Sequence, residues 1–328
     1  MGERGFRVYR GLDEIDHDFG PSALTIGNFD GVHAGHRDVV SRVVALARGR
    51  GWKSSALTFD PHPARIVAPE RAPRLLATTE ERVLLMREQG IEQVLILPFT
   101  RELAAFTPER FVKEIVVERL DARAVLVGDN FRFGHEHAGD TRLLAELGRR
   151  HGFLVEAVPA IRMRGRVVSS SEVRRLIQAG NVALAARLLA RPYALAGSVV
   201  SGQGIGSKQT VPTLNLAPGA EVLPARGVYI TRTTELGSAR HWRSVTNVGT
   251  RPTFDGDSVT VETFLLDPLE GESPKAIRVE FLRRLREERR FEDAAALKRQ
   301  ILRDVGRAQT YFRRVAAAGI RPAALGNW

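Results

Sequence analysis

Two histidines within a glycine-rich turn are the first residues whose types and spacing could carry out chemistry. The turn reads GNFDGVHAGH over residues 27–36, after the apolar run ALTI and before a helical pattern that begins near His36. His33 and His36, three residues apart at a helix start, can point the same way and donate hydrogen bonds to phosphate oxygens. Glycines let the backbone approach phosphate, and a helix N-terminus favours anions. The turn is therefore predicted to bind nucleotide phosphates.

Two other interpretations of this histidine pair stay open. It could be a surface pair without a role, or half of a zinc site, since imidazole is a common zinc ligand. The sequence holds no cysteine, and a carboxylate ligand would have to come from elsewhere in the chain. The surrounding glycines suit a phosphate cradle better than a metal cage, so phosphate binding is the favoured interpretation.

A serine-rich segment, VSSSEVR at residues 168–174, is a second element of interest. It is typical of a strand end that turns into a helix, with hydroxyls at the N-cap and Arg174 in the first turn. Alone it is weak evidence, because N-capping serines are common and a lone arginine more often lies on a solvated face. Its meaning depends on the turn that contains the two histidines.

A third segment, GQGIGSKQTVPTLN at residues 202–215, could bind a nucleotide and a metal ion. Its glycines allow close approach of the backbone to phosphate, and a rigid Pro-Thr turn is expected at its end. Thr213 and Asn215, two residues apart, put two hard oxygens on one side, which suits Mg²⁺. Three glycines could equally form a tight hairpin turn.

The elements that must position these residues follow two patterns, of which the first is α/β. From residue 23 to about residue 160, short β-rich apolar runs alternate with helical patterns, which predicts parallel strands joined by crossover helices. We expect a doubly wound parallel-sheet domain over residues 1–187. The 27–36 turn would follow its first strand, at the edge where such sheets bind ligands.

The rest of the chain has the pattern of a different fold. Short strands separated by glycine and proline, from Tyr193 to about residue 286, predict a compact antiparallel β-barrel or sandwich. A terminal helix, about residues 291–312, should pack on it. Residues 188–328 are assigned to this second domain. The apolar residues at helical spacing in that helix are Ala294, Leu297, Ile301 and Val305.

Length and composition fit a two-domain globular protein. The 328 residues exceed what one hydrophobic core usually organises, and the hydrophobic share of 43% is ordinary. No run of about 18 apolar residues could span a bilayer, and the N-terminus lacks the apolar core of a secretory signal. We expect a cytoplasmic protein without membrane attachment, stabilised by packing because disulfides are excluded. A homo-oligomer stays open.

The formal net charge of +11 raises the question of a nucleic-acid partner. The basic residues are scattered along the chain, and only five of the 49 are lysines, a skew that genome base composition could produce. We therefore expect no nucleic-acid partner, although the charge can help to attract anionic nucleotides.

Together, the 27–36 turn and the serine segment resemble the nucleotidyltransferase superfamily, and specifically the bacterial bifunctional riboflavin kinase/FAD synthetase family. Other segments resemble the same family in the same order, so the resemblance covers essentially the whole chain. These segments are FDPHP (59–63), VGDNFRFG (127–134), the 202–215 segment, GVY (227–229), NVGTRPTF (247–254) and VETF (261–264).

For the first domain, the resemblance implies attack of the FMN phosphate on the α-phosphorus of Mg-ATP. Pyrophosphate leaves, FAD forms, and no covalent enzyme intermediate occurs. His33, His36 and Arg174 would carry catalysis at the ATP phosphates, mostly by positioning and charge neutralisation. The other implied contacts are Gly27, Phe29, Asp30, Gly35, Ser170 and Ser171 for ATP, and His62, Asn130 and Phe131 for the flavin.

For the second domain, the resemblance implies ATP-dependent phosphorylation of riboflavin to FMN. Glu262 would be the general base that takes the proton of the ribityl hydroxyl, a role worth on the order of 10² to 10⁴ in rate. A solvated strand carboxylate is the alternative. Thr213 and Asn215 would hold Mg²⁺. The other implied contacts are Gly202, Gly204, Gly206 and Lys208 for ATP, and Arg286 for the flavin.

The kinase motif departs from the family pattern at two positions. Ser207 stands where the family usually has arginine, and Thr210 stands where it has glycine, although Lys208 could supply a charge to the phosphates. An FMN adenylyltransferase with a C-terminal flavin-binding module therefore stays open as an alternative. An aminoacyl-tRNA synthetase, which shares the HxGH turn, is disfavoured because SSSEVR replaces the expected lysine-rich loop.

Overall fold

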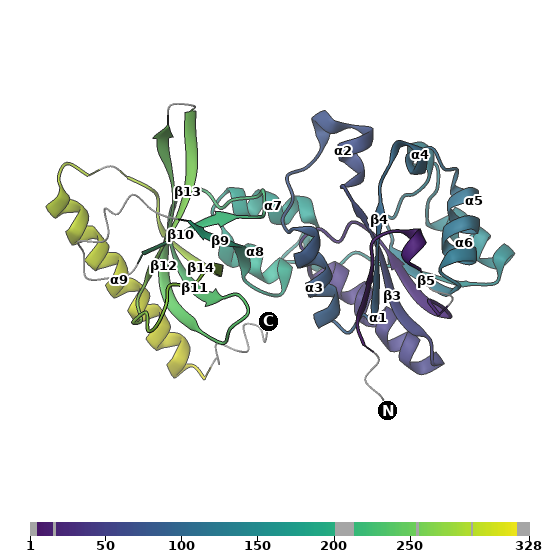
Figure 1. Ribbon diagram of the computed structural model, residues 1–328, viewed down its shortest axis with the longest axis horizontal. Helices are drawn as coiled ribbons and strands as arrows, with labels where there is room; N and C mark the ends of the chain where they lie inside the picture. Colours follow the sequence, from purple (N-terminus) through teal and green to yellow (C-terminus); the bar gives the residue numbers. More distant parts are fainter. Residues whose placement is uncertain (1–4, 16–17, 201–212, 254–255, 290, 320–328) are drawn as a thin grey trace. The chain divides into compact units, whose positions relative to one another are not determined.

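The computed structural model describes residues 5–15, 18–200, 213–253, 256–289 and 291–319. The chain divides into two compact units, Met1–Ser170 and Ser171–Trp328 (Figure 1). These units are defined by packing alone. The functional boundary expected between residues 187 and 188 therefore stays a prediction.

The first unit is built on a six-stranded parallel sheet in the order β1-β4-β3-β2-β5-β6. Figure 1 shows α3 on one side of this sheet and α5 and α6 on the other, which explains why the central strands are apolar on both faces. The doubly wound α/β fold is confirmed. The strands are β1 (Arg7–Tyr9), β2 (Ser22–Ile26), β3 (Lys53–Asp60), β4 (Gln93–Pro98), β5 (Ala122–Gly128) and β6 (Leu154–Val158).

The helices of the first unit alternate with these strands along the chain. In η3 the hydrogen bonds have the wider π-helical spacing, as at its end, where the Leu120 amide donates to the Ile115 carbonyl over 3.0 Å. A short hairpin pairs β7 (Arg162–Met163) with β8 (Arg166–Val167). The helices are η1 (Leu12–Glu14), α1 (Ala34–Arg50), α2 (Pro63–Val67), η2 (Pro69–Arg71), α3 (Thr79–Glu88), α4 (Arg101–Ala104), α5 (Pro108–Arg110), η3 (Phe111–Arg119), η4 (His135–His137) and α6 (Thr141–His151).

One face of the sheet packs against η3 and α6. Leu24, Leu57 and Val125 from three neighbouring strands join Phe111 and Leu144 in one buried cluster. Burial of each such side chain contributes roughly 1.5–3 kcal/mol to the free energy of unfolding. This packing fixes the positions at which the strands end.

The second unit is a closed barrel of six antiparallel strands in the order β10-β13-β12-β11-β14-β9. The expectation of an antiparallel barrel is confirmed. A Pro-Thr turn was predicted at the end of the 202–215 segment. This prediction is wrong for Thr213, which is the first residue of strand β10. The elements are α7 (Ser170–Gln178), α8 (Val182–Leu189), β9 (Tyr193–Val200), β10 (Thr213–Pro218), β11 (Gly227–Glu235), β12 (His241–Thr253), β13 (Gly256–Leu265), β14 (Ala276–Arg286) and α9 (Ala294–Ala317).

Buried hydroxyls line the inside of this barrel. The Thr231 hydroxyl lies 2.8 Å from the Ser244 hydroxyl and 2.7 Å from that of Thr246. The Thr246 hydroxyl in turn lies 3.0 Å from that of Thr263. These hydrogen bonds satisfy the polar groups that the barrel encloses.

The terminal helix α9 packs on the barrel through a face that only partly coincides with the predicted one, since Ile301 and Val305 are half-buried. Leu297 is 40% exposed, so the apolar stripe expected through Leu297 is wrong at this position. Among the side chains of α9 that the structure describes, the fully buried ones are Gln300, Asp304 and Ala308, four residues apart. Two of them are polar because arginines bind them: Arg286, the last residue of β14, places its Nε 2.9 Å from Asp304 Oδ2, and Arg289, after β14, binds Gln300.

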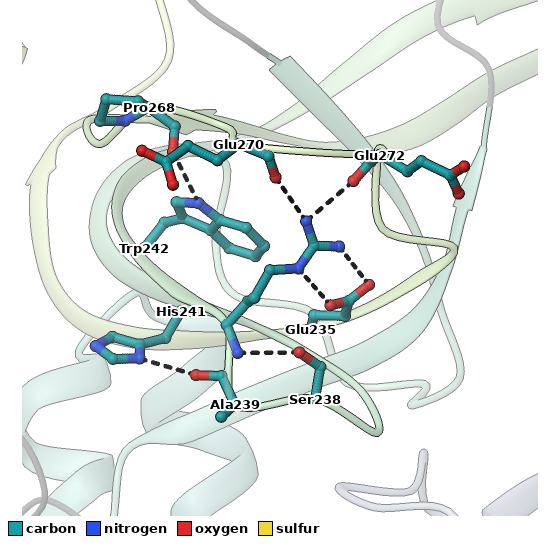
Figure 2. A network of polar contacts seen from close by, with 9 residues as sticks. Glu235, Ser238, Ala239, His241, Trp242, Pro268, Glu270 and Glu272 are labelled. Carbon is teal, nitrogen blue, oxygen red and sulfur yellow. Dashed lines mark hydrogen bonds and ion pairs between the residues drawn. The ribbon is translucent and has the colours of Figure 1, made fainter.

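Arg240 joins two connections at the end of the barrel where β11 leads into β12, and Figure 2 labels its partners Glu235, Glu270 and Glu272. Its Nε and Nη2 donate to the Glu235 carboxylate over 2.7 and 2.8 Å. Its Nη1 donates to the carbonyls of Glu270 and Glu272, in the connection between β13 and β14, over 2.8 and 3.1 Å. One guanidinium therefore holds this end of the barrel together.

This contact predicts a pH-dependent stability. The hydrogen bond from Arg240 holds the pKa of Glu235 below its ordinary value. A carboxylate with a depressed folded pKa stabilises the protein above the unfolded pKa of about 4.3, and this contribution is lost as the pH falls through the folded pKa. Arg240→Met should therefore lower the melting temperature at neutral pH, by an amount that shrinks in acid. Thermal melts of this variant and of the exposed control Arg303→Met check the prediction, and a pH-independent difference contradicts it.

Candidate functional site

The turn after β2 has an unusual backbone. Phe29, Gly31 and Val32 all have positive φ values, of 48°, 78° and 38°. Glycine adopts this region freely, but each of the other two residues costs about 1–2 kcal/mol there. Strained turns persist only where their surroundings hold them, and they concentrate at functional sites.

Asp30 is one of the residues that hold this turn. Its carboxylate, 2% exposed, accepts hydrogen bonds from the amides of Leu76 at 2.9 Å and Ala77 at 3.2 Å, just before α3. The Ser170 hydroxyl donates to the Asp30 carbonyl over 2.8 Å. Both side chains thus support the turn directly, and their predicted contacts with ATP stay predictions.

The structure brings His33 and His36 together. Their rings stack with centroids 3.7 Å apart and planes 14° apart, and the Phe29 ring meets His36 edge-on at 5.2 Å. His33 is the N-cap of α1, and its Nδ1 accepts from the His36 amide over 3.3 Å. Neutral His33 therefore carries its proton on Nε2, the nitrogen that can donate to a phosphate.

Gly35 lies close against the His33 ring. A Cβ at Gly35 would lie 3.2 Å from the His33 ring, tighter than ordinary contact. At Gly27 a Cβ would lie 3.4 Å from the Phe29 ring. A side chain at Gly35 would therefore press on the His33 ring, whereas at Gly27 a Cβ would make only ordinary van der Waals contact.

The residues predicted for the flavin follow strands next to β2. Asn130 and Phe131 follow β5, and His62 follows β3, so all three lie at the edge of the sheet that carries the histidine turn. The order of strands reverses at β2, where open α/β sheets bind ligands. His62 is the N-cap of α2, with Nδ1 accepting from the Ala64 amide over 3.2 Å.

The serine segment forms the start of α7, as predicted. Ser170 is the first residue of the helix, Ser171 is exposed, and Arg174, the fifth residue of the helix and so just past its first turn, is half-buried. Arg174 belongs to the second compact unit, so its contact with ATP phosphates stays a prediction.

Two residues predicted for the kinase site, Asn215 and Glu262, lie in a row with Asn247 across three strands of the barrel. Asn215 of β10 pairs with Glu262 of β13, which pairs with Asn247 of β12. Laterally paired residues point to the same face, with Cβ atoms about 4.5–5.5 Å apart. Their strand neighbours, such as Leu214 and Thr263, are buried inside the barrel, so the row lies on the outer face.

Thr213 lies on the same side of β10 as Asn215, two residues away. The structure therefore brings together the predicted base, Glu262, and the two predicted Mg²⁺ ligands. Hydroxyl, amide and carboxylate oxygens fit Mg²⁺, which usually takes one or two protein ligands and completes its shell with phosphates and water. Within the described part of the chain, no cluster of three His, Asp or Glu side chains forms a separate metal site.

Two residues near this row were not assigned from the sequence. Asn247 lies in the NVGTRPTF segment, and its register opposite Glu262 was the missing information. Glu288, after β14, lies over Gly249: a Cβ there would collide with the Glu288 carboxylate and lie 3.0 Å from Asn247 Nδ2. Asn247 therefore completes the row, and the Glu288 carboxylate borders it.

Other predicted contacts have different positions. Arg286 is bound to Asp304 through its Nε, and its Nη1 donates to the Glu287 carbonyl over 3.0 Å. Its predicted contact with the flavin stays a prediction. The predicted ATP contacts Gly202, Gly204, Gly206 and Lys208, and the departures Ser207 and Thr210, lie outside the described residues.

Comparison with known proteins defines the class. Residues 15–172 match the FAD synthetase family model, and residues 189–312 match the riboflavin kinase model. The chain is therefore a two-domain enzyme of the class that joins an FAD synthetase to a riboflavin kinase. The first match covers the histidine turn, and the second covers the row through Glu262.

Two relatives, both named bifunctional riboflavin kinase/FMN adenylyltransferase, define the family. The Escherichia coli (strain K12) protein is 36% identical over 88% of this chain and 92% of its own length. The Pseudomonas fluorescens protein is 36% identical over 92% of this chain and 97% of its own. This chain belongs to the bifunctional riboflavin kinase/FMN adenylyltransferase family, which confirms the resemblance.

One solved structure shares the fold over nearly the whole chain. It is described as "Crystal Structure of Macrolide-efflux Protein from Streptococcus pneumoniae" and covers 92% of this chain and 98% of its own, with a TM-score of 0.81 and 24% identity. In the described residues of the present chain, no helix has the length and apolar character needed to cross a bilayer.

Proposed function

We propose that this chain phosphorylates riboflavin to FMN in its second unit and adenylylates FMN to FAD in its first, using one ATP in each step. The observation that carries the proposal is that each family match contains one of the two groups of candidate site residues. The FAD synthetase match covers the paired imidazoles of His33 and His36, and the riboflavin kinase match covers the row through Asn215 and Glu262.

In the first unit, an FMN phosphate oxygen attacks the α-phosphorus of ATP. A new bond forms between them, the bond from the α-phosphorus to the bridging oxygen breaks, and pyrophosphate leaves. The Nε2–H of His33, together with His36, stabilises the charge that develops on the phosphates. Arg174, in α7 just after this unit, is proposed as a further phosphate ligand. Asn130 and the His62 loop lie towards FMN.

In the second unit, the ribityl hydroxyl of riboflavin attacks the γ-phosphorus of ATP, and ADP leaves. Glu262 accepts the hydroxyl proton as the new oxygen–phosphorus bond forms. Thr213 and Asn215 would hold Mg²⁺, which would supply neutralisation of the phosphate charge. The FMN product is then the substrate of the first unit. The cytoplasm, where ATP is abundant, is the proposed location.

A coupled assay tests the whole proposal. Purified full-length chain supplied with riboflavin, ATP and Mg²⁺ should yield FMN and then FAD by chromatography, and removal of Mg²⁺ with EDTA should stop both steps. A chain that makes FAD from FMN but makes no FMN from riboflavin supports the alternative of an adenylyltransferase with a flavin-binding module. Absence of both products under oxidising and reducing conditions rejects the proposal.

A further inference from the structure

Arg82, on α3, is the most deeply buried of the described arginines in the first unit. Its side chain is 1% exposed and is among the largest that are fully buried. Arginine is almost never buried to this extent unless it is paired. Burial lowers the pKa of Arg82 from its ordinary value, while Asp30 and Asp60 oppose that shift. The guanidinium stays charged.

The contacts of Arg82 lie at the ends of two neighbouring strands. Its Nη1 donates to the Asn28 carbonyl, in the turn after β2, over 2.7 Å. Its Nη2 donates to the Phe59 carbonyl, at the end of β3, over 3.3 Å. Thr58 joins the two, since its hydroxyl accepts from Arg82 over 3.0 Å and donates to the Asn28 carbonyl over 3.3 Å. One guanidinium therefore ties both loops to α3.

The Asn28 carbonyl is the point at which the strained backbone begins. The next residue, Phe29, has φ of 48°, and the turn then leads to the N-cap His33. The loop after β3 leads to His62. A planar fork of five donors can hold carbonyls on both loops at once, which a single lysine ammonium does less well.

We propose that Arg82 is a positioning residue for adenylyl transfer. It fixes the turn after β2 against the end of β3, so that His33 and His36 meet the ATP phosphates while the His62 loop faces the flavin. Because Arg82 is buried beneath the loops, it acts through them and does not touch the substrates. The inference rests on the function proposed for the first unit.

The test compares four variants of the full-length chain. Arg82→Met removes the fork, Arg82→Lys keeps the charge, and Thr58→Val removes only the linking hydroxyl. The matched control is Gln93→Met, because Gln93 is also buried and bonds the Phe19 carbonyl over 2.7 Å, at the other end of the sheet. Two measurements are made: kcat/KM for ATP in FAD formation, and hydrogen exchange of the amides of residues 27–36. Riboflavin phosphorylation by the same molecules reports the folded fraction of the second unit.

The expected result is specific to the turn. Arg82→Met should lower kcat/KM for FAD formation about 10²-fold, since displacement of reacting groups by about 1 Å can cost that much. Arg82→Lys should recover part of the activity, and Thr58→Val should show a smaller loss. All three should speed exchange in residues 27–36. Gln93→Met should lower the melting temperature without either effect.

Other outcomes overturn the inference. If Arg82→Met matches Gln93→Met in both kcat/KM and exchange, Arg82 has only a structural role. If Arg82→Met does not fold, the test relies on Arg82→Lys and Thr58→Val. Normal hydrogen exchange and normal kcat/KM in both of these variants would reject the positioning role of Arg82. If the wild-type chain forms no FAD, the proposed function fails, while the exchange comparison still tests whether Arg82 holds the turn.

Discussion

Replacing His36 with alanine should reduce FAD formation by about 10²- to 10³-fold and leave phosphorylation of riboflavin unchanged. The size of the loss is that expected when one donor to a developing negative charge is removed. His36 stacks on His33 at 3.7 Å, so its loss also frees the His33 ring to reorient. Arg174→Ala should also reduce FAD formation, because the arginine guanidinium can donate two hydrogen bonds to phosphate oxygens. Separate assays with FMN and with riboflavin measure the two activities.

The control for this experiment is His151→Ala, which replaces an exposed histidine at the end of α6. It should leave both activities unchanged. Equal loss of both activities in a folded His36→Ala protein would contradict independent sites. If the His36→Ala protein kept full FAD formation, the histidine pair would have only a structural role.

Replacing Glu262 with glutamine should strongly reduce the phosphorylation of riboflavin to FMN. The amide keeps the shape of the side chain but cannot accept the hydroxyl proton, and loss of a general base costs on the order of 10² to 10⁴ in rate. FMN formation should fall by that factor, while conversion of supplied FMN to FAD continues. Product chromatography with each flavin supplied separately makes the measurement.

Glu270→Gln is the matched control, because Glu270 is exposed in the connection between β13 and β14 and contributes a backbone carbonyl to Arg240. This variant should phosphorylate riboflavin normally. Normal FMN production by Glu262→Gln would remove Glu262 from the mechanism. The row of Asn215, Glu262 and Asn247 would then be a polar surface without a catalytic base.

The fold was predictable wherever local periodicity decided it. Alternating apolar runs and helical patterns fixed the parallel sheet, because strands covered on both faces must be apolar throughout. β1 was missed because it has three residues and lies at the sheet edge, where no pattern develops. Leu297 was placed on the buried face of α9 by the same rule. The rule failed there because arginines bind the polar side chains Gln300 and Asp304.

The candidate site was predictable where residues close in sequence form it. His33 and His36 share one turn, and Thr213 and Asn215 share one strand. Arg82 could not be found in this way, because a charged residue in a helical pattern is usually solvated, and its carbonyl partner at Asn28 is 54 residues away. Asn247 needed the register of β12 against β13, which follows from the closed barrel.

The hydroxyls inside the barrel have a consequence for the side chains on its outside. Thr263 and Thr246, joined at 3.0 Å within the barrel, directly follow Glu262 and precede Asn247 in sequence. A slip of one residue between these strands would turn Glu262 inward and push a hydroxyl out to solvent. The hydrogen bonds between the inner threonines therefore fix the register of the two strands. This register determines that the Glu262 carboxylate points outward, although the threonines themselves lie inside the barrel.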